Sequence, residues 1–196
     1  VYITTDFATT ESKKGDWTVA SVWAVDFKGN FRWIGGFLKK QLMDATVDGL
    51  FDLVERHAPL GVAIEVTGQQ GGFIPWLVRE MQARSIFFNL LSHGNGNKPG
   101  IRVISSKLQR FHEVVPLLKA GKIMIPHDVI HPWIDEFWAE VRLATVQGLK
   151  AKHDDVLDTI SQLYLIRPVV PAFEHALPSF MELDSFQDSQ YALSNY

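Results

Sequence analysis

The chain has 196 residues, a length that suits a single domain with one sizeable core. It contains no cysteine, which excludes disulfides and thiolate metal sites and leaves carboxylate and imidazole groups as the strong candidate ligands. The formal net charge of −3 argues against a strongly basic nucleic-acid-binding protein. No apolar run is long enough to cross a bilayer and no signal peptide opens the chain, so we expect a soluble intracellular protein.

Charge divides the chain into two parts. All 19 Lys and Arg side chains and 18 of the 22 acids lie in residues 1–171, whereas residues 172–196 hold four acids and no basic residue. We expect a folded domain over residues 1–171 and an acidic, extended tail over 172–196. Because Val1 starts directly in a strand-like run, we also expect the chain to be part of a longer polypeptide with a partner domain.

The opening third predicts an antiparallel meander of three strands. β-Rich apolar or alternating runs cover Val1–Ala8, Trp17–Asp26 and Phe31–Leu38, and a Lys-Gly-Asn turn joins the last two. Asp6 lies near the end of the first run, where a central strand would ordinarily carry an apolar residue.

The middle of the chain alternates between helix and strand. A helix is expected over Ala45–His57, capped by Asp44 or Thr46, and a second over Phe73–Arg84 after the glycine-rich turn of residues 67–72. Buried strands are expected over Val62–Val66 and Ile86–Leu91. A single acid, Glu65, interrupts the first of these strands near its end. This rhythm indicates an α/β fold with parallel pairing added to the meander.

The second half is mainly helical. Ser92–Ser106 is rich in glycine and asparagine and predicts a loop that does not pack into a core. Helical periodicity follows over Lys107–Ala120, over Pro132–Val146 and from Asp154 onward, with a short strand over Lys122–Ile125. The fold class is therefore a mixed central sheet flanked by helices.

The run Lys152–Asp158 places three carboxylates and an imidazole at the start of an apolar helix. One Asp there would serve as a helix cap. Three of them crowd like charges, which a bound cation would neutralise. Asp155 and Asp158 are three residues apart and share a face, whereas Asp154 is rotated about 100° from Asp155.

Parallel pairing of the strand that ends in Glu65 with the first strand would bring Asp6 and Glu65 side by side. The helix from Asp154 could then lean across the same edge, so that three acids face one point. Taken singly, Asp6 could instead initiate a turn, and Glu65 could be the buried partner of a Lys or Arg.

These residues also carry a family resemblance, which spans Val1 to Arg167. The motifs are Asp6 with the downstream Gly15-Asp16-Trp17-Thr18, Ile64-Glu65 before a glycine turn, and the Lys152–Asp158 run. Together they resemble the C-terminal nuclease domain of the large terminase subunit of tailed bacteriophages. The resemblance implies an RNase H-like fold and a metal-dependent endonuclease that cuts concatemeric viral DNA during packaging in the cytoplasm of the infected bacterial host.

The resemblance also implies partners and residue roles. The partners are double-stranded DNA, an N-terminal packaging ATPase domain of the same polypeptide, the small terminase subunit and the portal. Two Mg²⁺ or Mn²⁺ ions would assist phosphodiester hydrolysis, with Asp6 as the bridging ligand. The implied catalytic and metal-binding residues are Asp6, Glu65 and Asp155, with Asp154 and Asp158 as further metal ligands and His153 and Asp16 as auxiliary groups.

Basic side chains that flank these acids in sequence are expected to contact the DNA backbone. They are Lys13, Lys14, Lys98, Arg102, Lys107, Arg110, Lys150 and Lys152. Two rival functions remain open: a resolvase- or transposase-like nuclease of the same fold, and a catalytically silent module that binds DNA or a capsid component.

Overall fold

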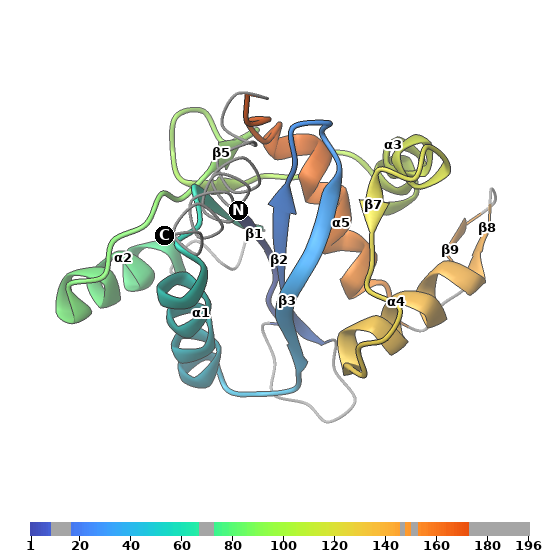
Figure 1. The fold of residues 1–196 in the computed structure, drawn as a ribbon. Helices are drawn as coiled ribbons and strands as arrows, with labels where there is room; N and C mark the ends of the chain where they lie inside the picture. Colours follow the sequence, from blue (N-terminus) through green and yellow to red (C-terminus); the bar gives the residue numbers. More distant parts are fainter. Residues whose placement is uncertain (9–16, 67–72, 146–147, 150–152, 173–196) are drawn as a thin grey trace, which may run out of the picture.

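The computed structural model describes residues 1–8, 17–66, 73–145, 148–149 and 153–172 (Figure 1). The main sheet consists of β1 (Tyr2–Asp6), β2 (Thr18–Val25), β3 (Phe31–Lys39), β4 (Gly61–Ile64) and β7 (Ile123–Met124). The helices are α1 (Met43–His57), α2 (Phe73–Arg84), α3 (Lys107–Lys119), α4 (Pro132–Leu143) and α5 (Asp155–Ile166). Two short strand pairs complete the described elements: β5 (Ser92–His93) with β6 (Gly100–Ile101), and β8 (Ala144–Thr145) with β9 (Gly148–Leu149).

The main sheet has the mixed topology that the sequence predicts. Its strand order is β4-β1-β2-β3-β7. The meander β1-β2-β3 is antiparallel, and β4 and β7 add in parallel at its two edges. Since β1 lies between β2 and β4, its end is surrounded by chain on both sides, and a group there can meet groups from several elements.

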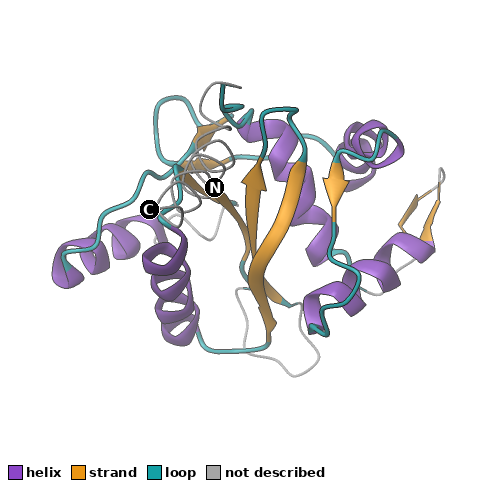
Figure 2. Cartoon of the chain, in the orientation of Figure 1, coloured by secondary structure: helices purple, strands orange, loops and turns teal. Residues whose placement is uncertain are grey.

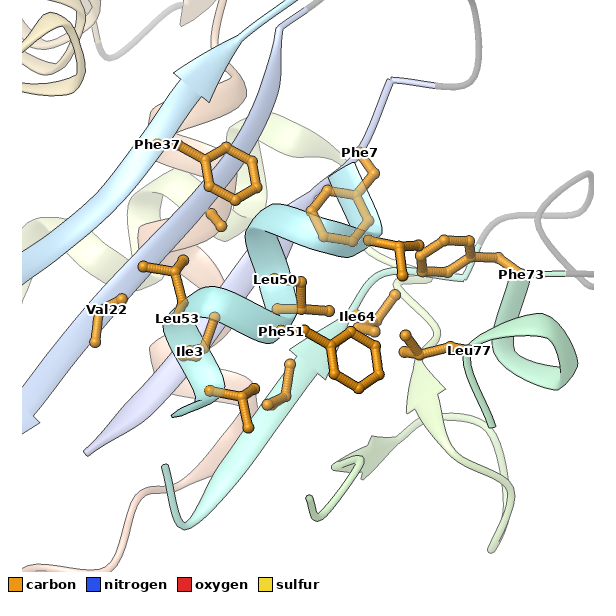
Figure 3. Packing of buried hydrophobic residues seen from close by; sticks show 14 of the residues in the cluster. Ile3, Phe7, Val22, Phe37, Leu50, Phe51, Leu53, Ile64, Phe73 and Leu77 are labelled. Carbon is orange, nitrogen blue, oxygen red and sulfur yellow. The ribbon is translucent and has the colours of Figure 1, made fainter. Parts of the chain in front are cut away.

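Helices cover both faces of this sheet (Figure 2). The alternation of side chains along β2 separates two cores, since Ala20 and Val22 belong to one cluster and Val19 and Trp23 to the other. The first cluster packs β1, β3 and β4 against α1 and α2, around side chains such as Leu50 (Figure 3). The second packs β2 and β3 against α3, α4 and α5.

Helix α5 is held against the sheet by polar contacts as well as apolar ones. Its residues from Asp155 to Leu163 are all buried. The Gln162 side chain accepts a hydrogen bond from Thr5 N–H (3.2 Å) and donates one to Thr5 C=O (2.7 Å). The hydroxyls of Thr159 and Ser21 lie 2.8 Å apart. These bonds fix α5 on β1 and β2, beside the residue that precedes Asp6.

The strand predicted over Ile86–Leu91 is wrong. Among the described residues, the segment pairs with β4 through one isolated parallel bridge, between Leu90 and Val62, where Leu91 N–H donates to Val62 C=O and Val62 N–H to Asn89 C=O. Phe87 is 71% exposed. A strand needs a continuous ladder with its neighbour, and an apolar run alone does not supply one.

Three smaller predictions are also corrected. The Ser92–Ser106 segment contains the pair β5-β6, and its Ile101 is fully buried, so this segment does pack into the core. Neither Asp44 nor Thr46 caps α1; its N-cap is Leu42, whose carbonyl accepts a bond from the Thr46 hydroxyl. Helix α4 ends at Leu143, where the chain turns into β8.

The structure bears only in part on the predicted C-terminal tail and on membrane spanning. Apart from Ala172, the predicted tail over 172–196 lies outside the described residues. Among the helices that the structure describes, none combines the length and apolar character needed to cross a membrane.

Candidate active site

Asp6 and Glu65 emerge at the same edge of the sheet. Asp6 is the last residue of β1, and Glu65 follows the last residue of β4. The two strands run in parallel, and their last registered pair is Thr5 with Ile64, so the next residues along both strands are the two acids. Strand pairing alone thus places these carboxylates on neighbouring backbones, as the sequence predicts.

Asp155 reaches the same edge from the other side. Its Oδ2 accepts a hydrogen bond from Trp17 N–H at 2.9 Å, just before β2 begins. The first residues of β2 pair with the end of β1, where Val19 is the partner of Asp6. Asp6 therefore lies between the strand that leads to Glu65 and the strand whose start holds Asp155.

Groups around Asp155 make a compact polar and aromatic cluster. His153 Nδ1 lies 3.7 Å from Asp155 Oδ2, and the His153 ring meets the Trp17 ring edge-on at 6.0 Å between centroids. Lys40 places its ammonium 4.7 Å from the centroid of the Trp17 ring. Trp17 belongs to the Gly15–Thr18 motif of the family resemblance, whereas Lys40 is a site neighbour that the sequence did not indicate.

Glu140 on α4 caps the N-terminus of α5. Its two carboxylate oxygens accept the backbone N–H groups of Val156 (3.1 Å) and Leu157 (2.8 Å). The side chain is fully buried, and burial raises the pKa of Glu140 to about 8, although both N–H bonds act in the opposite direction. Asp154 is the N-cap residue, but its side chain makes no capping bond. The capping role that the sequence offered to an Asp belongs to Glu140.

Asp158 forms a buried ion pair with Arg110 of α3. Arg110 Nη2 donates to Asp158 Oδ1 at 2.7 Å, and both side chains are 6% exposed. Burial lowers the pKa of Arg110, but the negative charges of Asp158, Glu65 and Asp6 more than offset this and raise it above its usual value. Arg110 thus lies within electrostatic range of the acids at the sheet edge. This position differs from the exposed DNA contact expected for it.

Only some of the other basic residues predicted to contact DNA lie among the described residues. Lys98 and Arg102 are exposed, and Arg102 follows Ile101, which bridges Glu65. Lys107 begins α3, and its side chain is not among the described ones. Asp16, Lys13, Lys14, Lys150 and Lys152 lie outside the described residues.

The carboxylates at this edge match the oxygen ligands that Mg²⁺ and Mn²⁺ prefer. In the described part of the chain, however, no three acidic or histidine side chains stand close enough together to hold a metal ion. Asp155 is engaged by Trp17 N–H, and Asp158 by Arg110. The residues fit a divalent ion by the chemistry of their oxygen atoms and by the edge of the sheet that they share.

The sequence contained an indication that the Glu140 side chain is buried. Glu140 lies three residues after Phe137 and seven after Trp133, on the apolar stripe that α4 buries. An acid on such a stripe needs hydrogen-bond donors inside the protein. The sequence does not show that the donors would be the first turn of α5.

Comparison with known proteins places the chain in a family. A family model described as the terminase RNaseH-like domain matches residues 3–166. No curated protein sequence matches.

Solved structures of the human cytomegalovirus terminase nuclease domain share the fold. The unsoaked domain aligns with a TM-score of 0.58 at 14% identity, over 83% of this chain and 80% of that one. A manganese-soaked form gives 0.57 at 12% identity over 85% and 82%, and a manganese-soaked, inhibitor-bound form 0.56 at 12% over 83% and 81%. The predicted RNase H-like fold and the resemblance to terminase nuclease domains are confirmed, and the chain belongs to the terminase RNaseH-like domain family.

Proposed function

We propose that this domain is a metal-dependent DNA endonuclease that cleaves concatemeric viral DNA during genome packaging in a tailed bacteriophage. The observation that carries the proposal is the parallel register of β1 and β4, which sets Asp6 and Glu65 side by side, with Asp155 anchored next to them. The family match and the likeness to a terminase nuclease domain that has been soaked with Mn²⁺ support it.

In this proposal Asp6, Glu65 and Asp155 would hold two Mg²⁺ or Mn²⁺ ions, with Asp154 as a further ligand. When bound, such ions activate water and stabilise charge on the phosphate and on the leaving oxygen. The chain's own groups orient the substrate. Asp6 is central and would contact both ion positions, and Trp17 N–H fixes the rotamer of Asp155.

His153 is the auxiliary group. Its Nδ1 lies 3.7 Å from Asp155 Oδ2, beyond hydrogen-bond distance but next to the proposed metal ligand, where the ring could meet a scissile phosphate. Backbone phosphates would be met by exposed Lys98 and Arg102 and by Lys13, Lys14, Lys107, Lys150 and Lys152. Asp16 would act from the segment before Trp17. The packaging ATPase domain, the small terminase subunit and the portal are the proposed assembly partners, in the cytoplasm of the infected bacterium.

The test is cleavage of supercoiled plasmid DNA with Mn²⁺ or Mg²⁺. Asp6→Ala should lower the rate at least a hundredfold without loss of folding, because a bridging ligand is removed. Asp52→Ala, which removes an exposed acid from α1, is the matched control and should cut normally. Wild-type rates from Asp6→Ala would refute the assignment. Binding of DNA without cleavage would favour a catalytically silent DNA-binding module. A preference for cutting branched DNA would favour a resolvase-like nuclease.

A further inference from the structure

Arg110 is a buried cation among acids for which the proposed chemistry assigns no role. It is 5% exposed, and its Nη2 donates to Asp158 at 2.7 Å. A guanidinium keeps its charge at every physiological pH. Its position on α3 therefore brings a permanent positive charge into the acidic edge of the sheet.

The geometry points to Arg110 as a positioning residue, the counter-ion of the acid cluster, which neutralises Asp158 and would compete electrostatically with any metal ion that Asp6, Glu65 and Asp155 hold. This inference rests on the proposed function. It assigns Asp158 to Arg110 rather than to a metal ion.

Three observations support this role. The Arg110–Asp158 pair is buried, so water screens its charges little. The negative charges of Glu65 and Asp6 also help to raise the pKa of Arg110, so its positive charge interacts with both acids at the edge of the sheet. Asp158 lies one helical turn after Asp155, and α3 packs along α5 at that turn. Without metal, Arg110 thus offsets the repulsion between the acids at the sheet edge. It would also reduce the attraction of these acids for a metal ion.

The role predicts opposite effects from the two partners. Arg110→Gln leaves Asp158 uncompensated, which makes the edge more negative, and Mn²⁺ should bind about tenfold more tightly. Asp158→Asn leaves the Arg110 charge uncompensated beside Glu65 and Asp6, and Mn²⁺ should bind about tenfold more weakly. The double variant Arg110→Gln/Asp158→Asn removes one charge of each sign, and its affinity should return to within about threefold of wild type.

The measurement is free Mn²⁺ by electron paramagnetic resonance during titration of each folded variant at one temperature. Arg84→Gln is the matched control, because it breaks a surface ion pair with Asp48 on the α1–α2 side and should leave Mn²⁺ affinity unchanged. A merely structural Arg110 would lower thermal stability without shifting the titration. An unchanged or weaker affinity in Arg110→Gln would overturn the counter-ion role, and a double variant as weak as Asp158→Asn would make Asp158 a metal ligand.

Folding of the single variants is itself informative, because removal of one partner strands a buried charge. If Arg110→Gln does not fold, Asp158→Asn and the double variant decide the question. If the folded wild type binds no Mn²⁺, the proposed function fails. The counter-ion role is then judged by metal-free urea unfolding, in which the double variant should be more stable than either single variant. Additive losses in that cycle would refute it.

Discussion

Three aspartates at the start of α5 have different surroundings. Asp155 is buried and hydrogen-bonded to Trp17, Asp158 is buried and ion-paired, and Asp154 is half-buried at the N-cap. Sequence spacing put Asp155 and Asp158 on one face, which agrees with their common burial. It did not distinguish a carboxylate facing the sheet edge from one facing a cation on α3, because that cation lies 48 residues away in the chain.

Asp155→Asn should abolish the stabilisation that Mn²⁺ gives the folded protein. A ligand present at about 100 times its Kd adds roughly 2.7 kcal/mol, or about 5–10 °C in Tm for a protein of this size. Asp154→Asn should retain most of this increment, since Glu140 already caps the helix. Melting with and without Mn²⁺ measures the effect. If Asp154→Asn loses the increment and Asp155→Asn keeps it, the two roles must be exchanged.

At the scale of elements, helix α5 depends on a carboxylate from α4. The two oxygens of Glu140 satisfy N–H groups in the first turn of α5 that have no partner within the helix. This contact fixes the start of α5, and with it the backbone of Asp155, against α4. The proposed site is therefore positioned by four elements: β1, β4, the start of β2 and α4.

The raised pKa of Glu140 gives this junction a pH dependence. Its pKa is about 8 in the folded protein and lower when unfolded, so between about pH 4.5 and 8 the folded state holds a proton that the unfolded state releases. The free energy of unfolding should fall as pH rises through this window, by at most about 1.4 kcal/mol per pH unit from this group.

Glu140→Gln should remove that contribution, so the free energy of unfolding of the wild type should fall relative to that of the variant as pH rises from 5 to 8. Urea unfolding at several pH values measures it. Glu55→Gln, an exposed change on α1, should run parallel to wild type. Parallel curves for Glu140→Gln would mean that Glu140 is ionised throughout.

The elements themselves were largely predictable. The bounds of α2 agree with the expected Phe73–Arg84, because a glycine-rich stretch of sequence and a polar end delimit its periodicity. The segment Ile86–Leu91 failed because its apolar residues resemble a strand, whereas the hydrogen bonds that make a strand come from a neighbour the sequence does not name. The buried contacts of Glu140 with α5 and of Arg110 with Asp158 could not be predicted for the same reason.

For the whole molecule, the proposed contacts with DNA would reach its phosphate backbone and would not read its bases. The net charge is −3, and the basic side chains are scattered along residues 1–171. Phosphate contacts of this kind release counterions and carry no sequence information.

Binding to duplex DNA should therefore be weak and similar for unrelated sequences. Its affinity should fall at least tenfold between about 50 and 200 mM salt. Fluorescence anisotropy in Ca²⁺, to prevent cutting, measures both effects. A footprint at one defined sequence that persists at high salt would contradict this expectation.

The sheet edge is proposed to be a metal centre organised around Asp6. Isothermal titration of Mn²⁺ into the wild-type domain and into folded Asp6→Ala tests this most directly, because it needs no DNA. We predict two bound ions for the wild type and the loss of both in Asp6→Ala, since the residue between the β4 end and the Asp155 anchor is removed. Two ions bound by Asp6→Ala with wild-type affinity would contradict the central claim.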